Sequence, residues 1–308
     1  MVHEATLTLG LPHTNRWGLA EDALMKYAGH LHWSWIASTI GTPLSHLRTI
    51  DGGEVYATFF FVEEVFPSGA PIEGFQLDDA LRFRIEQRAF KGIAIEGQII
   101  FDRIERLPEL TLDASPIAPS AGRGRHPYLR FGNIFITPEG GNRQLRVAAP
   151  ANGDFSRFPA LPNDDNPYQL TRAAQASGHL GLLDEPWQPA APGHDGFDVM
   201  YAIDPERDTN GAGLVYFANY FAFMDAADRT AAAACAVPAV RDCDGRLVQS
   251  RHTAFYGNVD VTGRLRTRVG FFLDPEQPSL VGVRYSMHRE EDGVMICLSE
   301  AIKRCVHA

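Results

Sequence analysis

The sequence is poor in cysteine, and the few cysteines it has are scattered. Cys235, Cys243, Cys297 and Cys305 include no CxxC pair. Disulfide-rich domains and structural zinc sites usually show paired or regularly spaced cysteines. We therefore expect neither a disulfide framework nor a zinc site, but reduced, structural thiols such as a cytoplasmic protein carries.

A leader segment, long apolar runs and an excess of positive charge are also missing. The first residues, MVHEATLTLGLPH, hold no basic segment followed by an apolar core, and no stretch approaches the ~20 apolar residues that span a bilayer. We therefore expect a cytoplasmic chain with no membrane partner. The net charge of −10 argues against nonspecific binding of nucleic acid, because such binding needs Lys and Arg to neutralise phosphates.

The common cofactor and hydrolase motifs are absent too. The sequence contains no GxGxxG that opens a helix in a βαβ unit, no GxxxxGK[ST], no HExxH and no GxSxG. No bound cofactor or metal is therefore expected. What the sequence does have is ordinary globular composition, with 308 residues of which 45% are hydrophobic and 21% charged, enough for roughly one to three domains.

Proline marks the middle of the chain as irregular. Twelve of the 20 prolines fall between Pro108 and Pro192, a concentration typical of loops. This region is expected to hold a strand at YLRFGNIFI (128–136) and a short helix near NPYQLTRAAQA. The expected organisation is a first unit at 1–137, a proline-rich connection with a short helix at 138–193, and a second unit at 194–308.

The parts on either side of this region repeat each other. Residues 14–38 and 209–233 both open with TNxxGL and continue with apolar residues at helical spacing. Further on, LRFRI (81–85) and LRTRV (265–269) both alternate arginines with residues of the opposite face, which are apolar except for Thr267. This alternation predicts half-buried strands. Chance similarity of two amphipathic helices is the alternative, but the turn and one strand agree as well as the helix.

Each part is expected to contain a strand, a long helix and then several strands. That order fits an antiparallel sheet curled around a central helix better than a βαβ alternation. Two such units could pair or pack their sheets and bury both helices. The later strands are expected at 54–66, 79–90 and 92–101, and again at 246–257, 264–273, 280–288 and 294–304.

Residues 208–220, DTNGAGLVYFANY, resemble a motif of the hotdog-fold 4-hydroxybenzoyl-CoA thioesterases, D-T-D-x-x-G-x-V-Y-H-A-N-Y, which leads into the central helix of that fold. The matching residues are Asp208, Thr209, Gly213, Val215, Tyr216, Ala218, Asn219 and Tyr220. The resemblance implies an α+β double hotdog, in which each unit is an antiparallel sheet wrapped around a long central helix.

Two positions differ from this motif. Asn210 stands where the family has its catalytic Asp, and Phe217 where it has His. An amide cannot act as a general base or form an acyl anhydride. The resemblance leaves intact a glycine-rich turn at a helix N-terminus, whose N–H groups can hold a thioester oxygen as it gains negative charge. The expected substrate-binding residues here are Gly213, Val215, Tyr216 and Phe217.

The whole chain also resembles the double-hotdog group typified by the bifunctional acyltransferase/decarboxylase of leinamycin biosynthesis. That resemblance implies decarboxylation of a malonyl- or methylmalonyl-type thioester of coenzyme A, followed by transfer of the acyl group through a tyrosine to an acyl carrier protein, in polyketide or other secondary metabolism. Acyl-CoA and the carrier protein would be the partners, with coenzyme A as part of the substrate. Pairing of the chain with itself stays open.

The candidates for catalysis each have a structural alternative. Asn219 could donate its NH₂ to the enolate formed when CO₂ leaves, or could bond a neighbouring loop. Asn210 could donate to the same oxygen, or could only favour the turn before a glycine. His32, on the first helix, could return a proton to the carbanion, or could be a half-buried helix histidine.

Tyr56, on the strand after the first helix, is the candidate acyl acceptor. A phenol needs activation because its pKa is near ~10, but its ester has a good leaving group. The sequence does not separate Tyr56 from Tyr216, Tyr220 or Tyr256, and a strand tyrosine can serve packing alone.

Arginines could bind the anionic parts of such a substrate. Arg123 and Arg125 in GRGRHP, and the row Arg264, Arg266 and Arg268, could contact coenzyme A phosphates or an acidic carrier protein. The alternative for either group is an ordinary charged solvent face.

Two other functions stay open beside the decarboxylating acyltransferase. One is a thioesterase or dehydratase that uses Glu21, Asp22 or Asp225, although the first two could simply favour the start of the first helix. Asp225 stands where the hotdog helix usually has a Glu. The other is a non-catalytic acyl-thioester-binding protein, for which the missing Asp and His would be the evidence.

Overall fold

The structure is a computed structural model that describes residues 2–90, 93–107, 124–161, 167–191 and 196–306. The chain forms two compact units. The first comprises Met1–Thr137 and Arg146–Pro167, and the second comprises Pro138–Leu145 and Tyr168–Ala308. The proline-rich stretch at 138–193 is therefore divided between the two units. No helix within the described ranges is long and apolar enough to cross a membrane.

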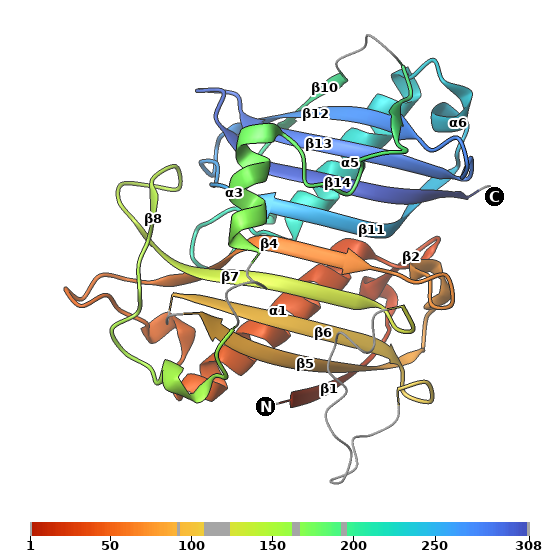
Figure 1. The fold of residues 1–308 in the computed structure, drawn as a ribbon. Coiled ribbons are helices and arrows are strands. Elements are labelled where there is room, and N and C mark those ends of the chain that lie inside the picture. Colours follow the sequence, from red (N-terminus) through yellow and green to blue (C-terminus); the bar gives the residue numbers. More distant parts are fainter. Residues whose placement is uncertain (1, 91–92, 108–123, 162–166, 192–195, 307–308) are drawn as a thin grey trace. The chain divides into compact units, whose positions relative to one another are not determined.

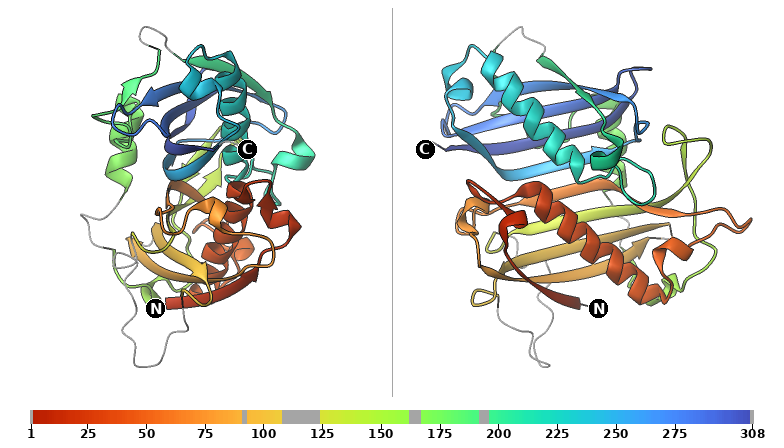
Figure 2. Two further views of the ribbon diagram at one scale, coloured as in Figure 1. Left: turned by 90° about the vertical axis from the view of Figure 1, so that its right-hand side faces the viewer. Right: turned by 180° about the vertical axis from the view of Figure 1, so that it is seen from behind.

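The first unit is an antiparallel sheet with a long helix against one face (Figures 1 and 2). Its strands run in the order β1-β5-β6-β7-β4. Their bounds are β1 Val2–Thr8, β4 Tyr56–Val65, β5 Ala80–Phe90, β6 Ala94–Arg103 and β7 Tyr128–Pro138, and the helix is α1 Glu21–Ile40. Short elements are β2 Thr14–Asn15, β3 Gly18–Leu19, β8 Leu145–Val147 and the 3-10 turns Leu11–His13, Leu44–His46, Ile72–Gly74 and Phe155–Arg157.

Helix α1 is held by its apolar face and by a glycine at its end. Ile36 and Ile40 pack with Ile95 and Phe135 of the sheet in a buried cluster. Full burial of each such side chain stabilises the fold by about 1.5–3 kcal/mol. The helix stops at Gly41, whose φ of 70° is the left-handed conformation that glycine adopts without strain.

The second unit repeats this plan (Figure 2). Its strands run in the order β11-β14-β13-β12-β10. Their bounds are β10 Phe197–Ala202, β11 Gly245–Phe255, β12 Arg264–Leu273, β13 Leu280–Arg289 and β14 Met295–Val306, with β9 Gln188–Pro189 as a short edge piece. The helices are α3 Tyr168–Ser177, α4 Pro205–Asp208, α5 Asn219–Ala234 and α6 Pro238–Arg241. Helix α5 crosses one face of the sheet, and α3 contributes Ala174 to a buried cluster with Ala254 and Leu298 of the strands.

The turn predicted before the first long helix is present. TNRWGL forms the β2–β3 hairpin, and the helix begins directly after it at Glu21. Gly18 has a φ of 125°, and a Cβ there would lie 2.8 Å from backbone atoms of the 73–75 segment, so the hairpin needs a glycine for close approach. The second long helix begins at Asn219, about one and a half turns later than the sequence predicts.

The two matching strands differ in burial. In β12 the arginines alternate with buried residues, as predicted for a half-buried strand. In β5, by contrast, Arg82 and Arg84 are as buried as their apolar neighbours. Arg84 Nε donates to Glu4 Oε1 at 2.5 Å, and Arg82 Nη1 donates to the Leu107 carbonyl at 2.8 Å. The alternation therefore predicted the strand correctly. It was wrong about the arginine face, which was expected to be exposed and is buried.

The expectation that all cysteines are reduced is wrong. Cys243 and Cys305 form a disulfide, with their Cα atoms 5.5 Å apart. The antiparallel pairing of β11 with β14, which ends at Gly245 and Val306, brings these cysteines together from positions 62 residues apart. Such a pair has no local spacing that a CxxC search would find. Cys235 and Cys297 carry free, buried thiols.

Candidate functional site

The turn at 208–214 is built around the side chain of Asn210. Its Oδ1 accepts hydrogen bonds from the N–H groups of Ala212 at 3.0 Å and Leu214 at 3.2 Å. The Asn210 carbonyl accepts from Gly213 N–H at 2.9 Å. The amide oxygen of Asn210 therefore shapes the turn, and these bonds do not use the donors of its NH₂ group.

Asn219 joins the start of α5 to the residues before the turn. Asn219 is the first residue of α5. The sequence had predicted a position about one and a half turns inside the helix. Its side chain is 7% exposed, and Nδ2 donates to the carbonyl of Asp208 at 3.0 Å and more weakly to that of Arg207 at 3.5 Å. In this arrangement the amide N–H groups tie α5 to α4.

Asp208, the first residue of the motif, is fully engaged. Its carboxylate accepts from Tyr201 Oη, Asp204 N–H and Arg207 Nε, each at 2.9 Å. Burial alone would raise the pKa of Asp208, but these bonds, the one from Arg207 first, outweigh it and lower the pKa. The side chain is 2% exposed, so it holds the turn rather than offering a base to a ligand.

The expected substrate-binding residues fall into two groups. Val215 and Phe217 are core residues, 3% and 6% exposed. Tyr216 is half-buried with its ring edge-on to Phe217, and burial raises its pKa to about 12. Gly213 lies at the exposed turn, where its carbonyl accepts from Asn142 Nδ2 at 2.8 Å. The open part of the motif is therefore the turn around Asn210, not its aromatic end.

Helix α5 carries two carboxylates that share a buried lysine. Lys303 Nζ, on β14, donates to Asp225 Oδ1 at 2.8 Å and to Asp228 Oδ2 at 2.9 Å. Burial alone would lower the pKa of Lys303, but the two carboxylates raise it well above its usual value, so the lysine is charged. Asp228 is buried and also accepts from Arg246 Nε at 2.8 Å and Tyr285 Oη at 3.2 Å.

Asp225 differs from Asp228 in its exposure. Its side chain is 35% exposed, whereas that of Asp228 is 3% exposed. Asp225 is therefore a carboxylate that Lys303 fixes in position and solvent can still reach. Lys303 is not among the residues predicted from the sequence, although a lysine in the mostly apolar strand segment VMICLSEAIK is a signal that could have indicated it.

His32 and Tyr56 belong to the first unit, whereas the turn belongs to the second. His32 is fully buried, its ring lies against Phe59 and Phe131, and burial lowers its pKa to about 3. It is thus neutral near pH 7. Tyr56 opens β4 and its Oη donates to Glu54 Oε2 at 2.5 Å. That bond, helped by partial burial, raises the pKa of Tyr56.

The remaining acidic candidates both lie at the start of α1. Glu21 is its first residue and is 8% exposed. Asp22 lies at the surface, where Lys26 Nζ donates to it at 3.0 Å, as in many surface ion pairs one helical turn apart.

The arginine candidates are scattered. Arg123 lies outside the described residues, and Arg125 is exposed. On β12, Arg264 pairs with Glu290 at 3.1 Å and Arg268 pairs with Asp198 at 2.9 Å, which neutralises much of that row.

No family model and no curated protein sequence matches the chain. Solved structures do match it along nearly its whole length. A provisionally named oleoyl thioesterase from Lactobacillus plantarum is 8% identical with a TM-score of 0.64, and covers 100% of this chain and 98% of its own. The 12:0-ACP thioesterase from Umbellularia californica is 8% identical with a TM-score of 0.60, covering 99% and 94%.

An acyl-ACP thioesterase from Bacteroides thetaiotaomicron is 9% identical, with a TM-score of 0.58 and coverage of 98% of each chain. Such identities speak for the fold alone. The chain therefore has the double hotdog fold, two units that each wrap an antiparallel sheet around a long helix, as the motif at 208–220 predicts.

Proposed function

We propose that this protein hydrolyses acyl thioesters of coenzyme A or of a carrier protein, with Asp225 as the activating carboxylate. The observation that carries the proposal is the pair of Asp225 and Lys303, a fixed and partly exposed carboxylate on the central helix of the second unit. Solved structures with the same double fold are named as thioesterases, which favours hydrolysis over other thioester chemistry.

The reaction assigns separate tasks to the helix and to the turn. Asp225 takes a proton from water as the water oxygen bonds to the thioester carbon, the C–S bond breaks, and the leaving thiolate takes up a proton, so that a carboxylic acid and a thiol result. Lys303 holds the carboxylate in place. The Asn210 NH₂ is the donor available from the turn to the oxygen that gains charge.

Asp225 is a better base for this reaction than the acids of α1. Glu21 is 8% exposed. Asp22 lies at the start of α1 in the first unit, whereas Asp225 lies on α5, the helix that follows the turn of the motif. Asp225 follows Asn219 by six positions in α5, which is roughly 9 Å along a helix axis.

The test is thiol release from a panel of acyl-CoA and acyl-carrier-protein substrates by wild type, Asp225→Asn and Asp22→Asn. We expect Asp225→Asn to lower kcat by about 100-fold or more, as removal of a general base does. Asp22→Asn is the matched control, because Asp22 is also a helix carboxylate bonded to a lysine, and it should keep the wild-type rate. Equal kcat values for the two variants would exclude Asp225.

A second candidate, decarboxylation with acyl transfer to a carrier protein, rests on the contact between Tyr56 and Glu54. The 2.5 Å bond places a carboxylate beside a half-buried phenol, the pairing that a nucleophile with its own base requires. The raised pKa of Tyr56 means that the phenol would depend on Glu54 to accept its proton.

Malonyl-CoA and methylmalonyl-CoA, offered with and without a carrier protein, separate the two functions. Loss of CO₂ and a mass increase on the carrier favour acyl transfer, whereas free acid and coenzyme A favour hydrolysis. Tyr56→Phe should abolish the transfer. Tyr256→Phe is the control and should leave the transfer intact, because the Tyr256 hydroxyl donates to the Thr171 carbonyl. If Asn219→Ala decarboxylates at the wild-type rate, the Asn219 amide does not stabilise the enolate.

A further inference from the structure

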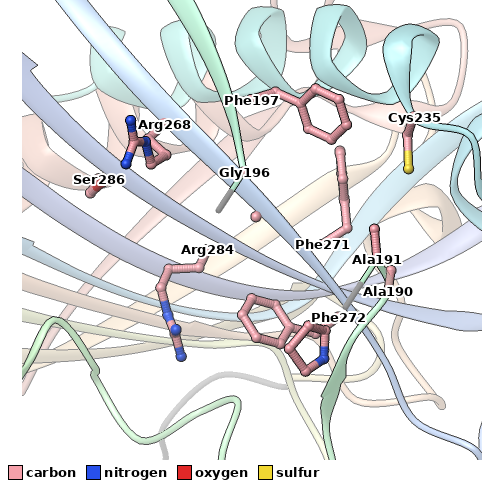
Figure 3. A pocket seen from close by; sticks show the side chains of 12 residues that line it. Ala190, Ala191, Gly196, Phe197, Cys235, Arg268, Phe271, Phe272, Arg284 and Ser286 are labelled. Carbon is pink, nitrogen blue, oxygen red and sulfur yellow. The ribbon is translucent and has the colours of Figure 1, made fainter. Parts of the chain in front are cut away.

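The second unit has a hollow of about 170 Å³ at the outer edge of its sheet (Figure 3). Two short pieces of chain cover this edge of β12. Strand β10 pairs with it as far as Phe197 opposite Val269, and β9 pairs with it from Pro189 opposite Phe272. The hollow lies beside Gly270, which stands between these paired residues of β12.

The hollow exists because Gly270 has no side chain. On a strand, residues two apart share a face, so Gly270 leaves a space between Arg268 and Phe272. Its partner across the ladder is Arg284. A Cβ on Gly270 would meet the Phe272 ring at 3.5 Å, an ordinary van der Waals contact. The backbone there is open to a ligand and could also accept a larger residue.

The walls of the hollow have two chemical characters. Arg268, Arg284 and Ser286 lie on one side of β12, whereas Phe197 and Phe271 lie on the other, together with the Cys235 thiol (Figure 3). The described residues that line the hollow include two arginines and no aspartate or glutamate. A ligand that fills this space therefore meets guanidinium groups at one end and aromatic rings at the other. Each guanidinium already has one carboxylate partner, Arg268 with Asp198 at 2.9 Å and Arg284 with Glu300 at 2.8 Å.

Arg284 is held where it can bind an anion. Its Nε donates to Glu300 Oε1 at 2.8 Å, and its guanidinium lies over the Phe272 ring, 4.7 Å from the centroid. Glu300 is fully buried, so its carboxylate fixes the arginine without lining the hollow. A guanidinium has five N–H donors in a planar fork, more than this single bond uses, and planar carboxylates suit such a fork.

We infer that this hollow binds a small carboxylate with an apolar tail, its carboxylate on Arg284 and its tail against Phe197 and Phe271. The size favours acids such as benzoate or hexanoate, since a cavity of about 150 Å³ holds a benzene molecule. Cys235 follows the last residue of α5, so the hollow lies roughly 24 Å along that helix from Asn219. The inference does not depend on hydrolysis, although hydrolysis would release an acid of this class.

The test is calorimetric titration of the whole chain with benzoate, hexanoate and benzylamine. Wild type is expected to bind the two acids and not the amine. Gly270→Val fills the hollow and should weaken benzoate binding at least tenfold, and a β-branched residue suits the strand. Arg266→Gln, an exposed residue of the same strand outside the hollow, is the matched control and should bind benzoate as wild type does.

A second variant keeps the test independent of how Gly270→Val folds. Arg268→Gln changes a side chain that is 47% exposed, and it should weaken benzoate binding while leaving thermal unfolding close to that of wild type. The inference is overturned if neither acid binds wild type, if benzylamine binds as tightly as benzoate, or if folded Gly270→Val binds benzoate unchanged.

Discussion

At the scale of single residues, Asn210 shows how a motif can keep its shape and change its chemistry. Its Oδ1 accepts from the N–H groups of Ala212 and Leu214, a task that an aspartate could perform equally well. The amide therefore preserves the turn while it removes the negative charge that an aspartate would carry there. Any base must then come from elsewhere, which is why the partly exposed Asp225 gains importance.

His32 is expected to make the protein sensitive to acid. Its pKa is about 3 in the folded chain and near ~6.5 when unfolded. Between these values only the unfolded chain takes up the proton, so the free energy of unfolding falls as the pH drops from 6.5 toward 3. The loss should be about 2 kcal/mol between pH 7 and pH 5, measured by urea unfolding at both.

The variant His32→Leu isolates this effect. It removes the titrating group from a pocket of aromatic rings, so its stability should change less than that of wild type over the same pH interval. An equal change in the two proteins would mean that other groups cause the acid sensitivity.

At the scale of elements, helix α1 and strand β6 fit together because Gly97 makes room for His32. A Cβ at Gly97 would lie 2.2 Å from His32 Nδ1, far inside any normal contact. The ring cannot easily turn away, because it lies against Phe59 and Phe131. Gly97→Ala is therefore expected to destabilise the protein by more than ~2 kcal/mol, as overpacking of a core does.

A double-mutant cycle measures this contact. In a His32→Ala background the added methyl group meets a space instead of a ring, so Gly97→Ala should cost much less there, and urea unfolding of the four proteins gives the coupling. Gly257→Ala serves as control, because its Cβ would meet its nearest neighbour at 3.4 Å and should show no coupling to His32. Additive effects of the first pair would contradict the packing argument.

The elements themselves could be predicted from sequence, but their surroundings could not. The periodicity of 79–90 predicted β5, and the repeated TNxxGL predicted a second unit like the first. The burial of Arg84 depends on Glu4, about 80 positions away, and local alternation carries no information about such a partner. The same limit applies to the later start of α5, which the contacts of Asn219 with the α4 carbonyls decide.

The candidate site was predictable in the same partial way. The motif at 208–220 located the turn, since its residue types are close together in the sequence. Lys303 could not be assigned to Asp225 from the sequence, because β14 and α5 meet only in the folded unit. The hollow at Gly270 depends on where β9 and β10 stop pairing, which is also a property of the fold.

At the scale of the whole molecule, the two units share a plan, yet only the second contains a disulfide among the described residues. It links the start of β11 to the end of β14, across 62 positions of sequence. Closing a loop of that length removes freedom from the unfolded chain and should stabilise the folded state by about 4 kcal/mol. For a unit of this size that corresponds to a melting temperature higher by roughly 10 °C.

The change to test is the double variant Cys243→Ser/Cys305→Ser. Its melting temperature, followed by circular dichroism, should lie below that of the oxidised wild type and should not move on addition of dithiothreitol. Wild type with dithiothreitol should fall to the level of the variant, while the number of thiols that react after denaturation rises by two, the cysteines of this disulfide. A wild type that gains these thiols without losing thermal stability would show that the link constrains nothing in the unfolded chain.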